Sequence, residues 1–506
     1  MGGQMARYKH TDVEEGQRVF LTINLKEQLV PETFEYMLND LLGKKIDISM
    51  FDENYKNDKT GSKAIPPAAL LKLIIYGYSK GIKSSRKLMD LNNENVIAKA
   101  LTGDMNIHWT TIADFISSNS EKFQEVFIKV LTYCVELGLI GGKTFAIDGC
   151  RLPANASINN SGTKKELEKK VEIYRRMAEK HVLKHIKKDG QTEMSKEEKK
   201  RYDKKQRHLN RQIEKINNFL KVIEPKKGAK KECKSNVTDN ESATLRSPTG
   251  FIQGYIGIAV SDKENQIILN AQAEGSANEG EHLPDILDST FSNLKEASVK
   301  IPEGETPVIM CDANYSSEVN LRACKEKGVE AIIPDKQHRL RLSKGGERIY
   351  EACDFEYNGE GNYYICPNGK RLEYKSNQML GGEEGKMYYA SVKDCRECPL
   401  NGRCLKTKKD INELKRGRSL LIKKSNAPGS LSAEMKKKLS TEEYRNQYAY
   451  RMQIIEPVFA NITYCKGLDR FTLRRKSKVN GQWKLYCIVH NLGKCLKKFN
   501  EITKTA

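Results

Sequence analysis

Three acidic residues have sequence contexts that could support chemistry on a phosphodiester. Asp148 and Asp312 each end a short apolar segment, and Glu456 lies within a segment, 448–459, that has the character of a helix. Mg²⁺ prefers oxygen ligands and is usually held by a few carboxylates. Two such ions about 3.5–4 Å apart can activate an attacking oxygen and stabilise the leaving one. The three acids could frame such a site, although an Asp at the end of a strand is more often a turn or cap residue.

A group of four cysteines could hold a different metal. The chain has 13 cysteines, most of them isolated, which is typical of a reduced cytosolic protein and not of a disulfide scaffold. Four follow the pattern C-x28-C-x2-C-x5-C, with Cys353 as an alternative ligand: Cys366, Cys395, Cys398 and Cys404. Four thiolates can bind Zn²⁺ tetrahedrally and stabilise a segment that is too short for its own core. A structural zinc site and four reduced thiols both stay open, and a closed site of this kind leaves no position for catalysis.

Two basic regions could contact nucleic acid. Residues 161–234 contain 25 Lys and Arg against 12 Asp and Glu, and apolar residues at heptad-like spacing between Leu209 and Ile223 predict a helical hairpin or coiled-coil arm. Its surplus charge favours phosphate contact over a merely solvated surface. A second basic group follows Glu456 and is either a phosphate-binding strip or a solvated turn: Arg470, Arg474, Arg475 and Lys476.

The elements that must position these residues differ along the chain. Residues 1–135 are expected to be mainly helical, with helical runs in 67–76 and 84–89 and a third that opens at 110–115 and ends in 123–139. Short helices with basic turns suit a helix-turn-helix-like reader of DNA, and an ordinary helical domain is an equal alternative.

Beyond residue 140, short apolar strands alternate with helical segments. This alternation predicts an α/β sheet that carries the acids along one edge. The expected strands are 144–149, 254–260, 266–273, 307–312 and 330–334, with a helix in 283–293. The basic arm and a second segment rich in Gly, Lys and Tyr, which contains the cysteine group, interrupt this sheet as insertions.

The composition limits the class of protein. The 506 residues carry 87 Lys and Arg against 66 Asp and Glu, a net charge of +21, and the hydrophobic content of 38% is enough for a core. No run of about 18 apolar residues predicts a membrane span, and residues 1–10 lack the features of a secretory signal. We therefore expect a soluble intracellular protein, with no membrane association, that binds an anionic partner such as DNA or RNA.

The chain resembles the DDE transposases of bacterial insertion sequences, which have an RNase H-like catalytic core. The resemblance covers nearly the whole chain and rests on ordered blocks of sequence: 65–72, 108–115, 146–157, 237–242, 254–255, 311–315, 451–459, 469–474 and 490–494. It implies that Asp148, Asp312 and Glu456 are the catalytic triad and bind two Mg²⁺ or Mn²⁺ ions.

Related enzymes also show a Tyr-x2-Arg-x3-Glu-x6-Lys signature around the glutamate. Here Tyr448 and Arg451 fit, but four residues separate Arg451 from Glu456, and nine separate Glu456 from Lys466. The signature implies DNA contacts for Arg451 and Lys466. The nearby acids Glu442 and Glu443 lack the Pro-x-Phe sequence that follows Glu456.

These observations predict an α/β fold with an RNase H-like mixed-sheet core, an N-terminal all-α domain, a helical-hairpin insertion and a small Cys-rich insertion. The expected boundaries are 1–135 for the DNA-binding domain, 161–234 for the hairpin, 341–430 for the Cys-containing insertion, and 140–160, 235–340 and 435–500 for the core.

The expected function is that of a DNA transposase that cleaves the ends of an insertion sequence and joins the 3′ ends to target DNA. The resemblance implies terminal inverted repeats and target DNA as partners, a homodimer in the synaptic complex, and a nucleoid-associated location in the bacterial cytoplasm. The alternatives are an RNase H-like nuclease without joining activity and an inactive DNA-binding protein derived from such an enzyme.

Overall fold

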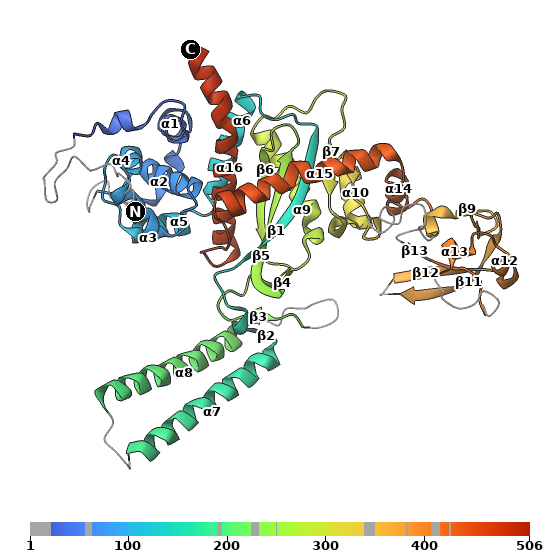
Figure 1. Cartoon of the computed structure of the whole chain (residues 1–506), viewed down its shortest axis with the longest axis horizontal. Helices are drawn as coiled ribbons and strands as arrows, with labels where there is room; N and C mark the ends of the chain where they lie inside the picture. Colours follow the sequence, from blue (N-terminus) through green and yellow to red (C-terminus); the bar gives the residue numbers. More distant parts are fainter. Residues whose placement is uncertain are drawn as a thin grey trace, which may run out of the picture.

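The computed structural model describes residues 22–55, 63–189, 195–223, 232–248, 250–338, 350–380, 383–405, 415–424 and 427–505. Figure 1 shows a group of N-terminal helices, a central sheet, a long two-helix arm and a small β-rich lobe. The expected fold class is confirmed: a mixed α/β core carries an all-α N-terminal domain and two insertions of different character.

The N-terminal helices pack around one helix that is buried on most of its surface, α2 (Pro67–Ser79). Pro67 occupies the first turn, where a missing N–H costs nothing. Gly77 permits close packing against α3, because a Cβ there would lie 2.0 Å from a Leu88 methyl carbon. The surrounding helices are α1 (Phe34–Asp40), α3 (Ser85–Glu94), α4 (Val96–Thr102), α5 (Trp109–Ser118) and α6 (Phe123–Glu136).

The central sheet contains both parallel and antiparallel strands. Its order is β4-β5-β1-β7-β8. The sixth strand, β6, pairs with the part of β5 that follows the residues paired with β4. β1 runs antiparallel to β5 and parallel to β7, which in turn runs parallel to β8. The bounds are β1 (Thr144–Pro153), β4 (Ala243–Ser247), β5 (Gly250–Asp262), β6 (Ile268–Glu274), β7 (Val308–Cys311) and β8 (Glu330–Ile332).

The first strand is longer than its apolar segment predicts. β1 does not end at Asp148, because its antiparallel pairing with the long strand β5 continues as far as Pro153 opposite Gly254. Its parallel pairing with β7 does end earlier, at Ile147 opposite Cys311. Asp148 therefore lies inside a strand, but directly after the last residue that is paired with β7.

The long helix α16 (Lys476–Thr505) connects the sheet to the N-terminal helices, and Figure 1 shows it between them. Trp483 is fully buried and donates its indole N–H to the carbonyl of Ile258, and Gly257 leaves room for its ring. Asn491 both donates to and accepts from the backbone of Ile268. The two domains therefore share one continuous apolar core.

The other helices around the sheet bring further segments to it. α9 (Leu283–Glu296) packs on β6, and α15 (Glu442–Ala460) crosses β1, β5 and β7. α10 (Glu318–Glu326) packs against α9 and α14 (Leu431–Lys438). Among the described residues, no helix is both long and apolar enough to cross a membrane.

The basic segment folds as the expected helical hairpin. α7 (Lys164–Asp189) and α8 (Lys196–Val222) pack side by side and extend away from the core, and the short strands β2 (Ser161–Gly162) and β3 (Ser235–Asn236) pair at its base. The predicted heptad residues Leu209 and Ile216 are buried. The sequence Asp189-Gly190 predicts a break between the two helices, and Gly190 lies outside the described residues.

The second insertion forms a separate small lobe. Its antiparallel sheet has the order β13-β12-β11-β10-β9, and two short helices, α12 (Val392–Arg396) and α13 (Asn401–Cys404), follow β12. It has its own apolar cluster, which includes Tyr364, Leu372 and Tyr388. The strand bounds are β9 (Glu356–Asn358), β10 (Tyr363–Ile365), β11 (Arg371–Leu380), β12 (Glu383–Ala390) and β13 (Ser419–Lys423).

Candidate active site

The strand register brings Asp148 and Asp312 together. Ile147 and Cys311 are directly opposite each other on the parallel strands β1 and β7, so Asp148 on β1 and Asp312, directly after β7, are the next residues along the two segments. Neighbouring strands lie about 4.8 Å apart, and side chains at equivalent positions point to the same face. The two carboxylates are therefore close neighbours at the end of the parallel ladder, although 164 positions separate them in the sequence.

Arg451 on α15 is the positive charge at this site. Its Nη1 lies 2.8 Å from Oδ2 of Asp148, and the Arg451 side chain is only 6% exposed. Oδ1 of Asp148 accepts a hydrogen bond from the backbone N–H of Gly149. Burial alone would lower the pKa of Arg451, but the charge of Asp148 and its hydrogen bond raise the pKa above its usual value. In this structure the guanidinium is committed to the acid and does not face solvent, where DNA would be contacted.

A third carboxylate, which sequence reasoning missed, lies beside the two aspartates. Glu279 belongs to the short 3-10 helix η5 (Glu279–His282) and is buried. Asn314 connects it to Asp312, because its side-chain nitrogen donates to Oε1 of Glu279 at 2.9 Å and to Oδ2 of Asp312 at 3.1 Å. In the sequence, Glu279 is one of several acids in its segment, so nothing local distinguishes it. The signal that could have pointed to a further acid is Asn314, a polar residue two positions after Asp312.

The three carboxylates affect one another electrostatically. Burial raises the pKa of Glu279 to about 7, and the negative charges of Asp312 and Asp148 add to this shift, while the Asn314 hydrogen bond opposes it. The pKa of Asp312 is likewise raised by burial and by Asp148, against the backbone N–H of Asn314 and the charge of Arg451. Clustered acids with such shifts are typical of functional sites.

Glu456 is on the same helix as Arg451, but the structure does not place it with the aspartates. Arg451, Ile455 and Val458 are buried against the sheet, whereas Glu456 is exposed. Five positions after Arg451, Glu456 is rotated by about 140° around the helix axis. No ion pair or hydrogen bond of Glu456 is found within the described part of the chain. The rival acids Glu442 and Glu443 are exposed in the first turn of α15.

The basic strip lies where the core meets the base of the arm. Arg470 and Arg474 are exposed and donate to the backbone carbonyls of Ala154 and Asn155, just beyond β1. The charge of Arg474 contributes to a lowered pKa of Lys215 on α8, after burial as the larger cause. The arginines therefore lie near the cationic arm.

The other two predicted strip residues are held at the start of α16, and the lysine of the signature lies apart. The backbone N–H of Arg475 donates to Asp239, and Lys476 forms an ion pair with Glu274 at 2.7 Å. Lys466 is half-buried, and burial lowers its pKa.

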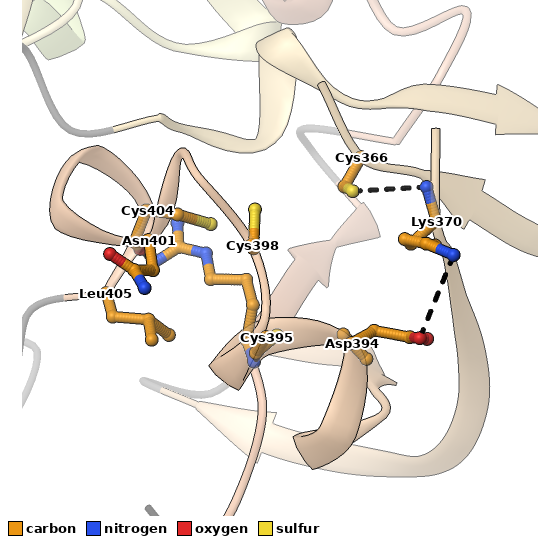
Figure 2. A pocket seen from close by; sticks show the side chains of 10 residues that line it. Cys366, Lys370, Asp394, Cys395, Cys398, Asn401, Cys404 and Leu405 are labelled. Atoms are coloured by element: carbon orange, nitrogen blue, oxygen red, sulfur yellow. Dashed lines mark hydrogen bonds and ion pairs between the residues drawn. The ribbon is translucent and has the colours of Figure 1, made fainter. Parts of the chain in front are cut away.

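The four predicted cysteines line one small cavity in the β-rich lobe (Figure 2). The cavity has a volume of about 20 Å³, which is room for one ion or one water molecule. Its sulfur-bearing residues are Cys366, Cys395, Cys398 and Cys404, whereas Cys353 is exposed and lines a neighbouring cavity instead. The four cysteines of the C-x28-C-x2-C-x5-C pattern thus line the same cavity.

The thiol environment has features of a metal-binding site. Three of the sulfurs accept backbone N–H bonds of 3.3–3.4 Å, those of Cys366, Cys395 and Cys398. Burial raises the pKa of Cys404 to about 11; the other cysteines add to this, and the charge of Arg418 opposes it. Metal binding would have to displace these protons.

The acidic site and the cysteine cavity both have suitable metal ligands, although in neither site are the ligand side chains as close together as in a formed metal site. Within the described ranges, no group of three or more His, Cys, Asp or Glu side chains has the spacing of a formed metal site. The donor chemistry nevertheless fits: oxygen ligands at Asp148 and Asp312 suit Mg²⁺ or Mn²⁺, and four thiols suit Zn²⁺. Oε2 of Glu279 is buried without a hydrogen-bond partner, which a cation would supply.

The chain thus combines a helical N-terminal domain with a mixed sheet that brings two aspartates together. Residues 365–496 match the family described as a transposase DDE domain, and residues 24–118 match a transposase domain (DUF772). No curated protein matches the chain. Both matched families are transposase families, so over these two segments the chain is similar to DDE transposases of insertion sequences. The DDE match includes Arg451, Glu456 and the cysteine lobe, while Asp148 and Asp312 precede it.

The ion pair at the site makes a testable prediction about stability. Replacing Arg451 by Gln leaves Asp148 without its counter-charge beside two other acids, so the metal-free protein should lose about 3 kcal/mol of unfolding free energy. Thermal denaturation in EDTA measures this loss, and millimolar Mg²⁺ should recover part of it. The exposed Lys498–Glu501 pair provides the control, since Lys498→Gln should change stability by less than about 1 kcal/mol. Equal melting of Arg451→Gln and the unmodified chain would contradict the prediction.

Proposed function

We propose that this transposase binds the ends of an insertion sequence, cleaves the DNA there and transfers the 3′ ends to target DNA. The observation that supports this most is the register of β1 and β7, which sets two aspartates side by side on a transposase fold. Two adjacent carboxylates provide the oxygen donors that metal-assisted phosphoryl transfer requires.

Asp148, Asp312 and Glu456 are the proposed ligands of two Mg²⁺ or Mn²⁺ ions. When bound, such ions lower the pKa of water and stabilise charge on the pentavalent phosphorus. The paired strands hold the aspartates beside the scissile phosphate, so that a water oxygen can attack it and release a 3′-hydroxyl. That hydroxyl then attacks a target phosphodiester in line, and no covalent bond to the protein forms.

Glu456 requires a movement of α15 to reach the aspartates. Arg451 and Glu456 lie on different faces of this helix, and Arg451 holds Asp148 in the present arrangement. A rotation of α15 that brings Glu456 inward would take Arg451 away from Asp148. We propose that DNA binding favours this rotation, because phosphates attract the released guanidinium. The predicted DNA-contact role of Arg451 then belongs to the DNA-bound state.

Substitution of the triad tests the catalytic assignment. Asp148→Asn, Asp312→Asn and Glu456→Gln should each reduce Mg²⁺-dependent cleavage of labelled end DNA at least about 100-fold, because a metal-binding charge is lost. Binding of end DNA should change only slightly, and Glu442→Gln is the control for an exposed acid on the same helix. Full cleavage by any triad variant would remove that residue from the site. Joined products from precut ends would exclude a nuclease without joining activity.

We further propose that the arm and the basic strip bind DNA. Arg470, Arg474, Arg475, Lys476 and Lys466 follow α15 in the chain, and the first two are exposed near the base of the cationic arm. Contacts to terminal inverted repeats and to target DNA can be divided between this surface and the N-terminal helices. Synapsis of two DNA ends favours a homodimer, and chromosomal DNA as substrate favours a nucleoid-associated location in the bacterial cytoplasm.

The salt dependence of DNA binding tests the strip. An Arg470→Gln/Arg474→Gln variant should weaken DNA binding and reduce the magnitude of the slope of log K against log salt by about 2. The variant would make two fewer phosphate contacts, so its binding would release fewer counterions from the DNA. Fluorescence anisotropy over a salt series measures both quantities. Lys498→Gln/Lys504→Gln removes the same charge from the far end of α16 and should leave the slope unchanged. An unchanged slope for the arginine variant would assign these residues to a solvated turn.

We propose that the cysteine cavity holds one structural Zn²⁺. The metal would cross-link the end of β10, at Cys366, to the two short helices. This cross-link would stabilise a lobe whose own apolar cluster is small. Because four thiolates close the coordination sphere, this ion would stabilise the lobe without taking part in cleavage.

Metal content tests this proposal. Protein purified without chelators should contain about one zinc per chain by elemental analysis. Cys395→Ser or Cys398→Ser should remove the zinc and destabilise the lobe, whereas Cys353→Ser should retain it. A zinc-free protein that folds normally would show that the four thiols are simply reduced cysteines.

A further inference from the structure

Glu279 is buried in a way that an ordinary structural acid is not. Its side chain is 4% exposed, and no ion pair to it is found within the described part of the chain. Oε1 accepts the hydrogen bond from Asn314, but Oε2 has no partner. Leaving a buried carboxylate oxygen without a partner is costly, so the fold must gain something else from this residue.

The surrounding backbone is built to admit this side chain. A Cβ on Gly149 would lie 2.5 Å from Oε2 of Glu279 and 2.5 Å from a methyl carbon of Ile256, so glycine after Asp148 leaves the carboxylate the space that it occupies. A Cβ on Gly280 would lie 2.3 Å from the carbonyl oxygen of Asn314, so glycine also lets η5 approach the loop after β7. Asn320 fixes this approach by donating to the carbonyl of Gly280 at 2.8 Å.

The carboxylate is directed into the acidic site. Asn314 bonds to both Glu279 and Asp312, so the two carboxylate oxygens are separated by no more than two hydrogen-bond lengths. Gly149, whose position Oε2 approaches, is the residue after Asp148. Glu279 thus lies against both aspartates, with its unpartnered oxygen on the side of β1.

We propose that Glu279 is a third protein ligand of the divalent-cation site of Asp148 and Asp312, acting before DNA is bound. A cation there gives Oε2 a partner and offsets the repulsion among three acids, of which only Asp148 forms an ion pair within the described part of the chain, with Arg451. This inference rests on the proposed function, and it deepens that proposal by naming a ligand outside the expected triad.

The substitution Glu279→Gln separates a ligand from a structural acid. A glutamine oxygen can still accept the Asn314 hydrogen bond, so a purely structural role survives the change. A role as a charged ligand does not survive it. The matched control is Glu281→Gln, which changes an exposed acid two positions away that accepts a hydrogen bond from Asn278.

Binding of Mn²⁺ to the full chain without DNA, followed by calorimetry and by electron paramagnetic resonance, provides the test. Glu279→Gln should weaken Mn²⁺ binding at least about tenfold, as Asp312→Asn should, since each removes one ligand charge. Glu281→Gln should bind as the unmodified chain does. Glu279→Asp, which keeps the charge on a shorter side chain, should retain an intermediate affinity.

Thermal melting excludes a simple folding defect. In EDTA, Glu279→Gln should melt at or above the temperature of the unmodified chain, because it removes an uncompensated buried acid. Its melting temperature should then rise less on addition of Mn²⁺.

The outcomes distinguish this inference from the proposed function. Unchanged Mn²⁺ affinity of Glu279→Gln, with affinity lost in Asp148→Asn and Asp312→Asn, would overturn the role of Glu279 and leave the aspartate site intact. If the unmodified chain binds no Mn²⁺ without DNA, the proposed role of Glu279 is also overturned. The cleavage assay of the triad variants would then still test the proposed function.

Discussion

The parallel pairing of β1 with β7 is the constraint on which the candidate site depends. It sets Asp148 and Asp312 at equivalent positions on neighbouring strands, where their charges repel each other. The protein offsets this repulsion with the guanidinium of Arg451, with the charge of Arg151, and with hydrogen bonds from Asn314 and Gly149. A cation bound among these acids would offset the remaining repulsion, as the proposed metal-assisted chemistry requires.

The rest of the core holds this pair of strands in register. β5 pairs with β1 over its whole length, and α16 anchors β5 and β6 through Trp483 and Asn491. Because α16 also packs on the N-terminal helices, the proposed DNA-reading domain and the acidic site belong to one apolar core. The DNA that the N-terminal helices would bind therefore has a fixed relation to the strands that carry the aspartates.

The two insertions leave the sheet at points that do not disturb this pairing. The arm departs after β1 and returns before β4, with β2 and β3 closing its base, so its strong positive charge lies outside the core. The cysteine lobe departs after β8 and returns before α14 and has a sheet and a cluster of its own. Each insertion could thus take part in the proposed DNA or metal binding while β1 and β7 keep their register.

The sequence by itself predicted the N-terminal helical region, most strands of the central sheet, the hairpin arm and the grouping of four cysteines, because periodicity, turn residues and short spacings are local properties. The full length of β1 and the strands β9 to β13 were not predicted, because they depend on pairing with other strands. Only the tertiary structure decided the partners of those residues. The pair of Arg451 with Asp148 depends on how α15 is rotated over the sheet, and that rotation also exposes Glu456. Glu279 enters the site because two glycines allow close approach of segments that are far apart in the chain. Such convergence follows from strand register and helix packing, which no local pattern encodes.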